Sequence, residues 1–209
     1  MTLGQKELLE LKYWIRAELL DGPDGLAAQK AMQLQYVRSL GLSDSLESPD
    51  AAVLEIGAGP CWGMLPSFRW TGLCVAVDPL FEAFGHLGLL ENEERGDIRY
   101  YSAPFEQWDT DLTFDAILCA NALDHGEMGF HLLPKIARLL KPGGRFYLYV
   151  HLRPPALLNL LHDHSLTLES LDKHLSYTHL VEVSREILGR DDIADWNCPT
   201  LIGIWQKPL

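Results

Sequence analysis

Hydrophobic and polar positions follow two different patterns along this chain, and the pattern changes near residue 51. In the first forty residues, apolar side chains recur every three to four positions, which predicts amphipathic helices. The residues that would share one face of the first helix are Leu8, Leu11, Ile15 and Leu19. Gly22-Pro23 then interrupts the pattern, and a second helix is expected from about Asp24 to Leu40.

From Ala51 onward, short apolar runs alternate with helical segments. The expected strands are 52–56, 73–77, 98–102, 114–119 and 145–151, and the expected helices are 63–70, 80–90 and 131–140. Continuous apolar strands separated by helices indicate a parallel sheet covered on both faces. The C-terminal strands, 180–187 and 201–206, have no helix between them and predict a hairpin-like addition to the sheet.

Charge and composition indicate which classes of substrate or partner this protein binds. The formal net charge is −12, and no basic stripe is present that could replace counterions on nucleic acid, so a small-molecule substrate is expected. No apolar run is long enough to span a membrane. The four cysteines are scattered and form no disulfide framework, which fits a cytoplasmic location. Nothing in the composition indicates the oligomeric state.

A glycine loop follows the first strand of the alternating region, in the segment VLEIGAGPCWGM. Gly57 and Gly59 allow a sharp turn and a close approach of a ligand to the main chain. The next strand ends in Asp78, about 20 residues later, where an acidic side chain can accept hydrogen bonds from a ribose diol. Asp78 could equally cap the helix that follows, and the two roles are compatible.

The residues after Gly59 distinguish between adenosine ligands. A dinucleotide site usually reads G-x-G-x-x-G, and here the third glycine position is Trp62, with Gly63 one residue later. A pyrophosphate cradle is therefore disfavoured, as is a nicotinamide-dependent dehydrogenase. The loop predicts an adenosine ligand without phosphates.

Taken in order along the chain, these motifs resemble those of the class I S-adenosylmethionine (SAM)-dependent methyltransferases. An acidic residue followed by G-x-G matches Glu55, Gly57 and Gly59, and the ribose-binding acid matches Asp78. The family's helix-and-turn motif matches IARLLKPGG, in which Lys141 is expected to cap the helix end.

The resemblance implies an α/β, Rossmann-like fold with helices on both faces of a seven-stranded, mostly parallel sheet. The implied strand order is 3-2-1-4-5-7-6, with strand seven antiparallel. Residues 51–209 would form the SAM-binding domain, and residues 1–50 a helical segment. In similar methyltransferases such a segment closes over the cofactor, which makes it a candidate lid. The alternative is an amphipathic helix docked on the sheet edge with Trp14 in the core.

The resemblance also implies a set of cofactor contacts. SAM would be the cofactor and S-adenosylhomocysteine (SAH) the product. The expected SAM-binding residues are Glu55, Gly57, Ala58, Gly59, Asp78, Pro79, Ala103, Pro104, Phe105 and Asn121.

Several histidines follow the later strands, where ligands of doubly wound sheets bind. Histidine suits the removal of a proton from a methyl acceptor. The catalytic candidates are His125, His151 and His164, with Asp124 and Arg153 beside them in sequence. His164 belongs to the triplet His162-Asp163-His164, which reads as a base with an orienting carboxylate or as a polar helix end before a new helix near Thr167. No metal site is expected, because two histidines do not form a closed ligand set.

The predicted function is methyl transfer to a small molecule. The segment after the fourth expected strand (114–119) is Ala120-Asn121-Ala122-Leu123. It lacks the Pro-Pro-aromatic loop of methyltransferases that act on flipped bases. Transfer to a hydroxyl oxygen is preferred over transfer to nitrogen. The alternatives are a SAM-binding pseudoenzyme or regulatory subunit, and a transferase that uses SAM in another way.

Overall fold

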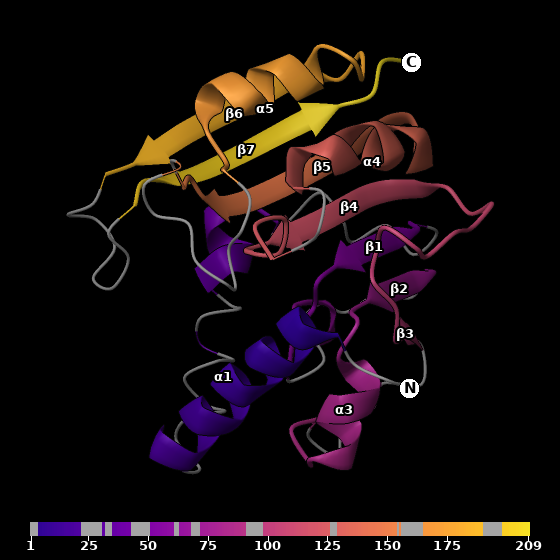
Figure 1. The fold of residues 1–209 in the computed structure, drawn as a ribbon. Coiled ribbons are helices and arrows are strands. Elements are labelled where there is room, and N and C mark those ends of the chain that lie inside the picture. The colour runs from indigo at the N-terminus through magenta and orange to yellow at the C-terminus, as the bar shows by residue number, and fades with distance from the viewer. Residues whose placement is uncertain are drawn as a thin grey trace.

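A single seven-stranded sheet forms the centre of the molecule in the computed structural model (Figure 1). The structure describes residues 4–21, 31, 35–42, 51–60, 63–67, 72–90, 98–125, 129–153, 155, 165–189 and 198–209. The strands are β1 (Val53–Ile56), β2 (Cys74–Val77), β3 (Ile98–Tyr101), β4 (Phe114–Ala120), β5 (Leu140–His151), β6 (Val181–Leu188) and β7 (Thr200–Gln206). Their spatial order is β3-β2-β1-β4-β5-β7-β6, which confirms the predicted topology.

Strands β1 to β5 pair in parallel, whereas β7 pairs antiparallel with both β5 and β6. Strands β6 and β7 therefore pair antiparallel and add to the sheet, as their sequence pattern predicts. The carboxyl ends of the parallel strands meet at one edge of the sheet, so the loops after β1, β2, β3, β4 and β5 lie together there.

Two apolar cores, one on each face of the sheet, explain the continuous apolar runs of β1 and β2, which are buried along their whole length. The face that carries Leu54 and Ile56 packs against α4 (Leu133–Leu139) and α5 (Leu168–Leu175). The opposite face packs against α3 (Phe81–His86) and the helical residues 35–39. Figure 1 shows α4 and α5 on one side of the sheet and α1 and α3 on the other.

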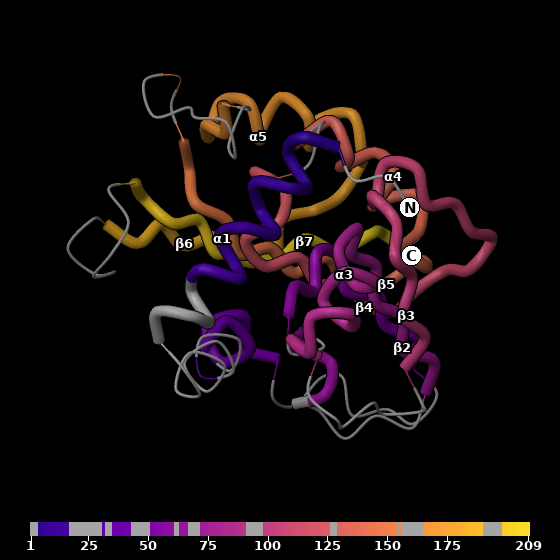
Figure 2. The backbone as a smooth tube through the Cα atoms, turned by 60° about the horizontal axis from the view of Figure 1, so that its bottom comes forward, coloured from indigo at the N-terminus to yellow at the C-terminus, as the bar shows by residue number. Residues whose placement is uncertain are grey.

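Helix α1 (Gln5–Asp21) confirms the first predicted helix. Leu11 and Trp14 on this helix are partly buried against the core beneath α3. In Figure 2, α1 crosses in front of the sheet, in the region where the strand ends lie. Among the residues that the structure describes, no helix is long and apolar enough to cross a membrane.

Two predicted helices are shorter than their sequence patterns suggest. Helix α3 ends at His86 rather than near Leu90, because Gly88 adopts a left-handed φ of +72° and the amide of Leu89 bonds the carbonyl of Phe84. The segment after the glycine loop forms only a 3-10 turn, η1 (Leu65–Ser67), instead of a helix from Gly63. Residues 68–70 lie outside the described part of the chain.

The end of α4 corrects one residue role. Lys141 does not cap this helix: its ammonium lies 2.7 Å from Asp115 Oδ2, and Asp115 also accepts the amide of Ala52. The carbonyls of Ala137 and Leu140 instead accept hydrogen bonds from Lys207 Nζ, at 3.0 and 2.7 Å. The helix end is thus capped by Lys207, which directly follows β7 and lies 70 and 67 positions further along the chain than the two carbonyl groups. No local sequence pattern reveals this contact.

Candidate functional site

The glycine loop turns sharply at the carboxyl end of β1. Gly57 has a φ of +67° and Gly59 a φ of +69°, a region that side-chain-bearing residues rarely adopt. A Cβ on Gly57 would collide with Ala122 in the segment after β4, whereas a Cβ on Gly59 would meet nothing within 4 Å. The loop is therefore packed on one side and open on the other, as a loop that receives a ligand requires.

Asp78 links this loop to the end of β2. Its Oδ2 accepts the Gly59 amide at 2.8 Å, and its Oδ1 accepts the Leu80 amide at the same distance. The prediction that Asp78 caps the following helix is thus partly correct. The amide that its carboxylate accepts belongs to Leu80, the residue just before α3. Burial raises the pKa of Asp78 to about 6, and the two amide bonds oppose that shift. The carboxylate retains lone pairs that could accept a diol.

Glu55 supports the loop from beneath. Its carboxylate is buried at the end of β1 and accepts the amides of Met64 and Leu65 at 2.8–3.1 Å. A Cβ on Gly63 would lie 2.7 Å from both carboxylate oxygens. Gly63 therefore serves as the close-packing glycine that the shifted motif left in question. Burial raises the pKa of Glu55 to about 8.

The loop after β3 is tied to the same edge. The Ala103 amide bonds the carbonyl of Asp78 at 3.2 Å, and Ser102 Oγ bonds the carbonyl of Pro79 at 3.3 Å. Ala103 and Pro104 are partly exposed at this edge. The ring of Phe105 is instead buried in the core on the α4 face, with Lys135 Nζ 4.7 Å from the ring centroid. Among the three residues, the first two are thus the more accessible to a ligand.

The segment after β4 supplies polar groups opposite the glycine loop. Asn121 has a left-handed φ of +50°, its amide bonds the carbonyl of Tyr149, and its buried Oδ1 accepts no hydrogen bond within the described structure. Asp124 is fully buried and accepts Arg153 Nε at 3.1 Å. His125 Nε2 lies 3.9 Å from Asp124 Oδ1, and burial lowers the pKa of this imidazole. The structure therefore brings together the sequence candidates after β4 and β5.

His151 occupies a different environment from His125. It is 1% exposed, and its Nδ1 lies 2.8 Å from the hydroxyl oxygen of Thr200 on β7. Burial lowers the pKa of His151 to about 4, so the ring is neutral at physiological pH. The imidazole is a buried structural neighbour of the site in this conformation.

Glu10 is the site-facing residue that the sequence pattern did not single out. Its Oε1 lies 4.0 Å from His125 Nδ1, although 115 positions separate the two residues. Glu10, Lys6 and Trp14 are spaced by four residues and share a helix face, which was the one available signal. His162, Asp163 and His164 lie outside the described residues, as do Cys61 and Trp62. Within the described residues, no three metal-ligating side chains gather.

These features define the class of the protein. A sheet of order 3-2-1-4-5-7-6, a glycine loop after β1 and an acid after β2 are the arrangement of class I SAM-dependent methyltransferases. The open side of the loop at Gly59 and the buried amide oxygen of Asn121, which accepts no hydrogen bond within the described residues, fit a ligand that carries polar groups.

Comparison with known proteins finds a matching family model. Residues 54–148 match the model of the methyltransferase domain. The matching family model and the structural neighbours are those of class I SAM-dependent methyltransferases, for which SAM is the cofactor.

Individual relatives support this assignment. The chain is 32% identical over 145 residues to a ubiquinone biosynthesis O-methyltransferase of Xanthomonas oryzae pv. oryzae, an alignment that covers 67% of this chain and 58% of the relative. It is 32% identical over 169 residues to the uncharacterized methyltransferase YcgJ of Bacillus subtilis, covering 74% and 64%. The chain thus spans less than two thirds of the length of these curated relatives. The fold matches the N-methyltransferase NodS of Bradyrhizobium japonicum, solved with SAH, with a TM-score of 0.62, 19% identity, and 95% and 98% of the two chains covered.

Proposed function

We propose that this protein transfers the methyl group of SAM to a small-molecule acceptor, with a hydroxyl oxygen as the preferred nucleophile. The observation that carries the proposal is the bond from the Gly59 amide to the Asp78 carboxylate, which joins the loops after β1 and β2 into one cradle at the carboxyl edge. The curated relative from Xanthomonas is an O-methyltransferase, whereas the structural neighbour NodS is an N-methyltransferase. The acidic composition and the absence of a base-flipping loop support a small acceptor.

Each cofactor contact has a proposed role. Asp78 holds the ribose diol, and the amides of Gly57, Ala58 and Gly59 lie along the ligand. Ala103 and Pro104 are proposed to contact the adenine ring of the cofactor. Phe105 is proposed to support that surface, because its own ring is buried in the core. Glu55 stabilises the glycine loop by accepting the amides of Met64 and Leu65. Pro79 stabilises the loop after β2, because its carbonyl accepts a hydrogen bond from Ser102 Oγ. Asn121 offers its amide oxygen to a ligand donor, because a buried acceptor without a partner is energetically costly.

Methyl transfer from a sulfonium is an in-line displacement, which requires the acceptor to be held close to the methyl carbon. When bound, SAM supplies the electrophilic methyl group. His125 is proposed to accept the proton of the acceptor, because its imidazole is neutral, partly accessible and flanked by Asp124. Asp124, fixed by Arg153, would stabilise the imidazolium that forms. His151 is proposed to have a structural role through its contact with the Thr200 hydroxyl group. His164 remains a candidate on the basis of the sequence alone.

A ligand-binding screen tests the proposal. Thermal unfolding is followed with SAM, SAH and NAD, for the wild type and for Asp78→Asn, which preserves size but removes the charge. SAM and SAH should raise the melting temperature of the wild type, and NAD should not. The substitution should weaken binding by about 1.5–3 kcal/mol, the usual contribution of a charge-assisted hydrogen bond. Stabilisation by NAD alone would contradict the proposal, and SAM binding without transfer to any acceptor in a broad panel would indicate a non-catalytic protein.

A further inference from the structure

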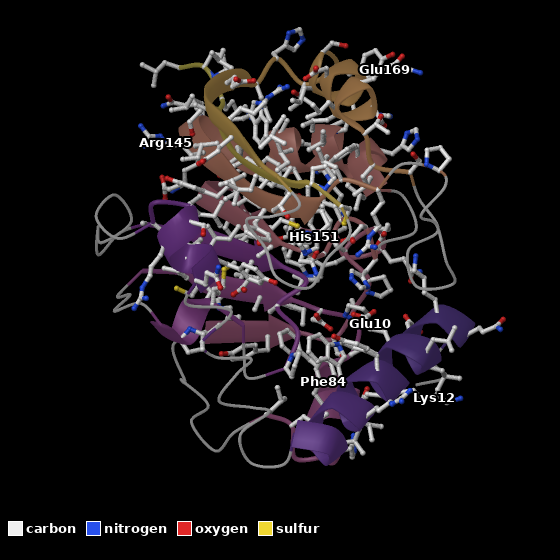
Figure 3. The ribbon with its side chains drawn as sticks, turned by 90° about the vertical axis from the view of Figure 1, so that its left-hand side faces the viewer. Glu10, Lys12, Phe84, Arg145, His151 and Glu169 are labelled. Carbon is white, nitrogen blue, oxygen red and sulfur yellow. The ribbon has the colours of Figure 1, made fainter. Side chains whose placement is uncertain are left out.

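Glu10 brings a carboxyl group to the site from the N-terminal helix. Its side chain is 22% exposed to solvent, and its Oε1 lies 4.0 Å from His125 Nδ1. Figure 3 shows Glu10 on the side of α1 that faces the strands, toward the edge at which β5 ends with His151. Leu11 and Trp14 fasten the same helix to the core beneath it. The docking of α1 therefore determines where this carboxyl lies.

The surroundings of Glu10 are mostly acidic. The groups that act on it are Lys6 and Trp14 from its own helix, Asp78 from the end of β2, and Asp124 from the segment after β4, with His125 alongside. Burial raises the pKa of Glu10 to about 8, and Asp78 and Asp124 add to that rise, whereas Trp14 and Lys6 oppose it. The ammonium of Lys6 thus does not compensate for the acidic neighbours. Without a ligand, the carboxyl group is mainly protonated at pH 7.

The proposed ligand carries a positive charge in this region. SAM bears its sulfonium between the ribose, assigned to Asp78, and the methyl group, directed toward the acceptor at His125. Glu10 interacts with both of these residues. SAH differs from SAM by one methyl group and by that charge, since its sulfur is a neutral thioether. A cation close to a buried carboxyl group favours the ionised carboxylate.

We propose that Glu10 recognises the sulfonium charge of SAM, losing a proton when α1 covers the cofactor, and so makes the site prefer SAM over SAH. This inference rests on the proposed function. In the reaction the C–S bond breaks with its electron pair left on sulfur, the new bond forms between the methyl carbon and the acceptor oxygen, and the hydroxyl proton passes to His125. Glu10 can then take up a proton as the positive charge disappears. The loss of this attraction would favour release of SAH.

Proton-linked calorimetry tests the inference without a methyl acceptor. Binding of SAM and SAH is measured at pH 7.0 in buffers of different ionisation enthalpy, which yields the number of protons released. The wild type should release up to about 0.9 proton more with SAM than with SAH, because a group with a pKa of about 8 is about nine-tenths protonated at that pH. Sinefungin, which carries an ammonium group in place of the methyl sulfonium, should resemble SAM.

Glu10→Gln should abolish the difference in proton release and lower the SAM-to-SAH affinity ratio about tenfold. The matched control is Glu7→Gln on the same helix, since that carboxylate accepts the Gly4 amide at 2.6 Å. This control should behave as the wild type does. A measurement on the wild type alone gives a second test: the affinity ratio should rise with pH between 6.5 and about 8 and then level off.

Three results would overturn the inference: an undiminished proton difference in Glu10→Gln, equal weakening of SAM and SAH, or a pH-independent ratio in the wild type. If the wild type binds both ligands while Glu10→Gln behaves identically, only the role of Glu10 is refuted. If the folded wild type binds neither ligand, the proposed function fails as well. The two failures are thus distinguishable.

Discussion

Gly63 and Glu55 are in such close contact that a Cβ on the glycine would lie 2.7 Å from both carboxylate oxygens. The contact exists because Glu55 reaches under the loop to accept the amides of Met64 and Leu65. Glu55, within β1, and the glycine eight positions later thereby form one structural unit. A motif with its third glycine displaced can still build the loop, provided that the glycine meets the buried carboxylate.

Gly63→Ala should therefore be more destabilising than an ordinary glycine substitution. The new Cβ would collide with Glu55 and Ala58 while the backbone keeps a φ of +77°. We expect a loss of about 2–4 kcal/mol in the free energy of unfolding, measured by urea titration. Gly88→Ala is the matched control, because its φ is +72° and nothing lies within 4 Å of its Cβ. That variant should lose only about 1 kcal/mol, and equal losses at both positions would contradict the close contact.

The stability of the protein should fall as the pH rises from 6.5 to 7.5. Burial raises the pKa of Glu55 from 4.5 to about 8, so the folded state retains a proton that the unfolded state has lost. Each such group changes the free energy of unfolding by up to about 1.4 kcal/mol per pH unit, and Glu10 should behave in the same way. This contribution is fully present below pH 4.5 and disappears above about pH 8.

Chemical denaturation across this pH range checks the sign. Glu55→Gln cannot titrate and should remove about half of the slope. Glu82→Gln, an exposed change on α3, is the control and should leave the slope unaltered. A stability that increases with pH in the wild type would show that the Glu55 carboxyl is ionised in the folded state.

His125→Gln should impair turnover far more than SAM binding. The substitution removes the proposed proton acceptor beside Asp124 but leaves the cradle formed by Gly59 and Asp78 intact. General-base catalysis typically contributes about 10²–10⁴-fold, so a loss in that range is expected in single-turnover assays of SAH formation. His86→Gln, on the exposed side of α3, should retain full activity. Parallel losses of SAM affinity and turnover in His125→Gln would indicate a binding role instead.

The two lysines near the end of α4 should differ in their effect on stability. Lys207→Met removes two bonds to the carbonyls of Ala137 and Leu140 and should cost about 1–2 kcal/mol. Lys141→Met removes a half-exposed ion pair with Asp115 and should cost less than about 1 kcal/mol. Thermal and urea unfolding of both variants give the comparison. The reverse order would restore Lys141 as the residue that stabilises the helix end.

Much of the fold follows from local sequence patterns. The parallel strands β1, β2 and β4 are short and mainly apolar, and the pattern of the C-terminal residues predicted that β6 and β7 would pair. The boundaries were less predictable, because tertiary contacts set them. Strand β5 begins at Leu140 rather than Arg145, since Leu140 already pairs with Phe114 on β4.

The candidate site also has a part that the sequence predicted and a part that it did not. Glu55, Gly59 and Asp78 lie in or beside strand ends, so their spacing along the chain was enough to predict that they would meet at one edge. The environments of the histidines were not predictable in this way. His125 remains partly accessible beside Glu10 of α1, whereas His151 is buried against Thr200 of β7, so the difference depends on contacts with distant parts of the chain.

The sequence by itself determined the architecture, the glycine loop and the acid after β2, because periodicity and short-range spacing encode strands, turns and the sheet edge at which they end. Only the tertiary structure decided that Lys207 caps α4 and that Glu10 reaches His125. Both contacts join residues from distant parts of the chain, and their energies depend on burial and on neighbouring charges. Those quantities exist only once the helices and the sheet have packed together.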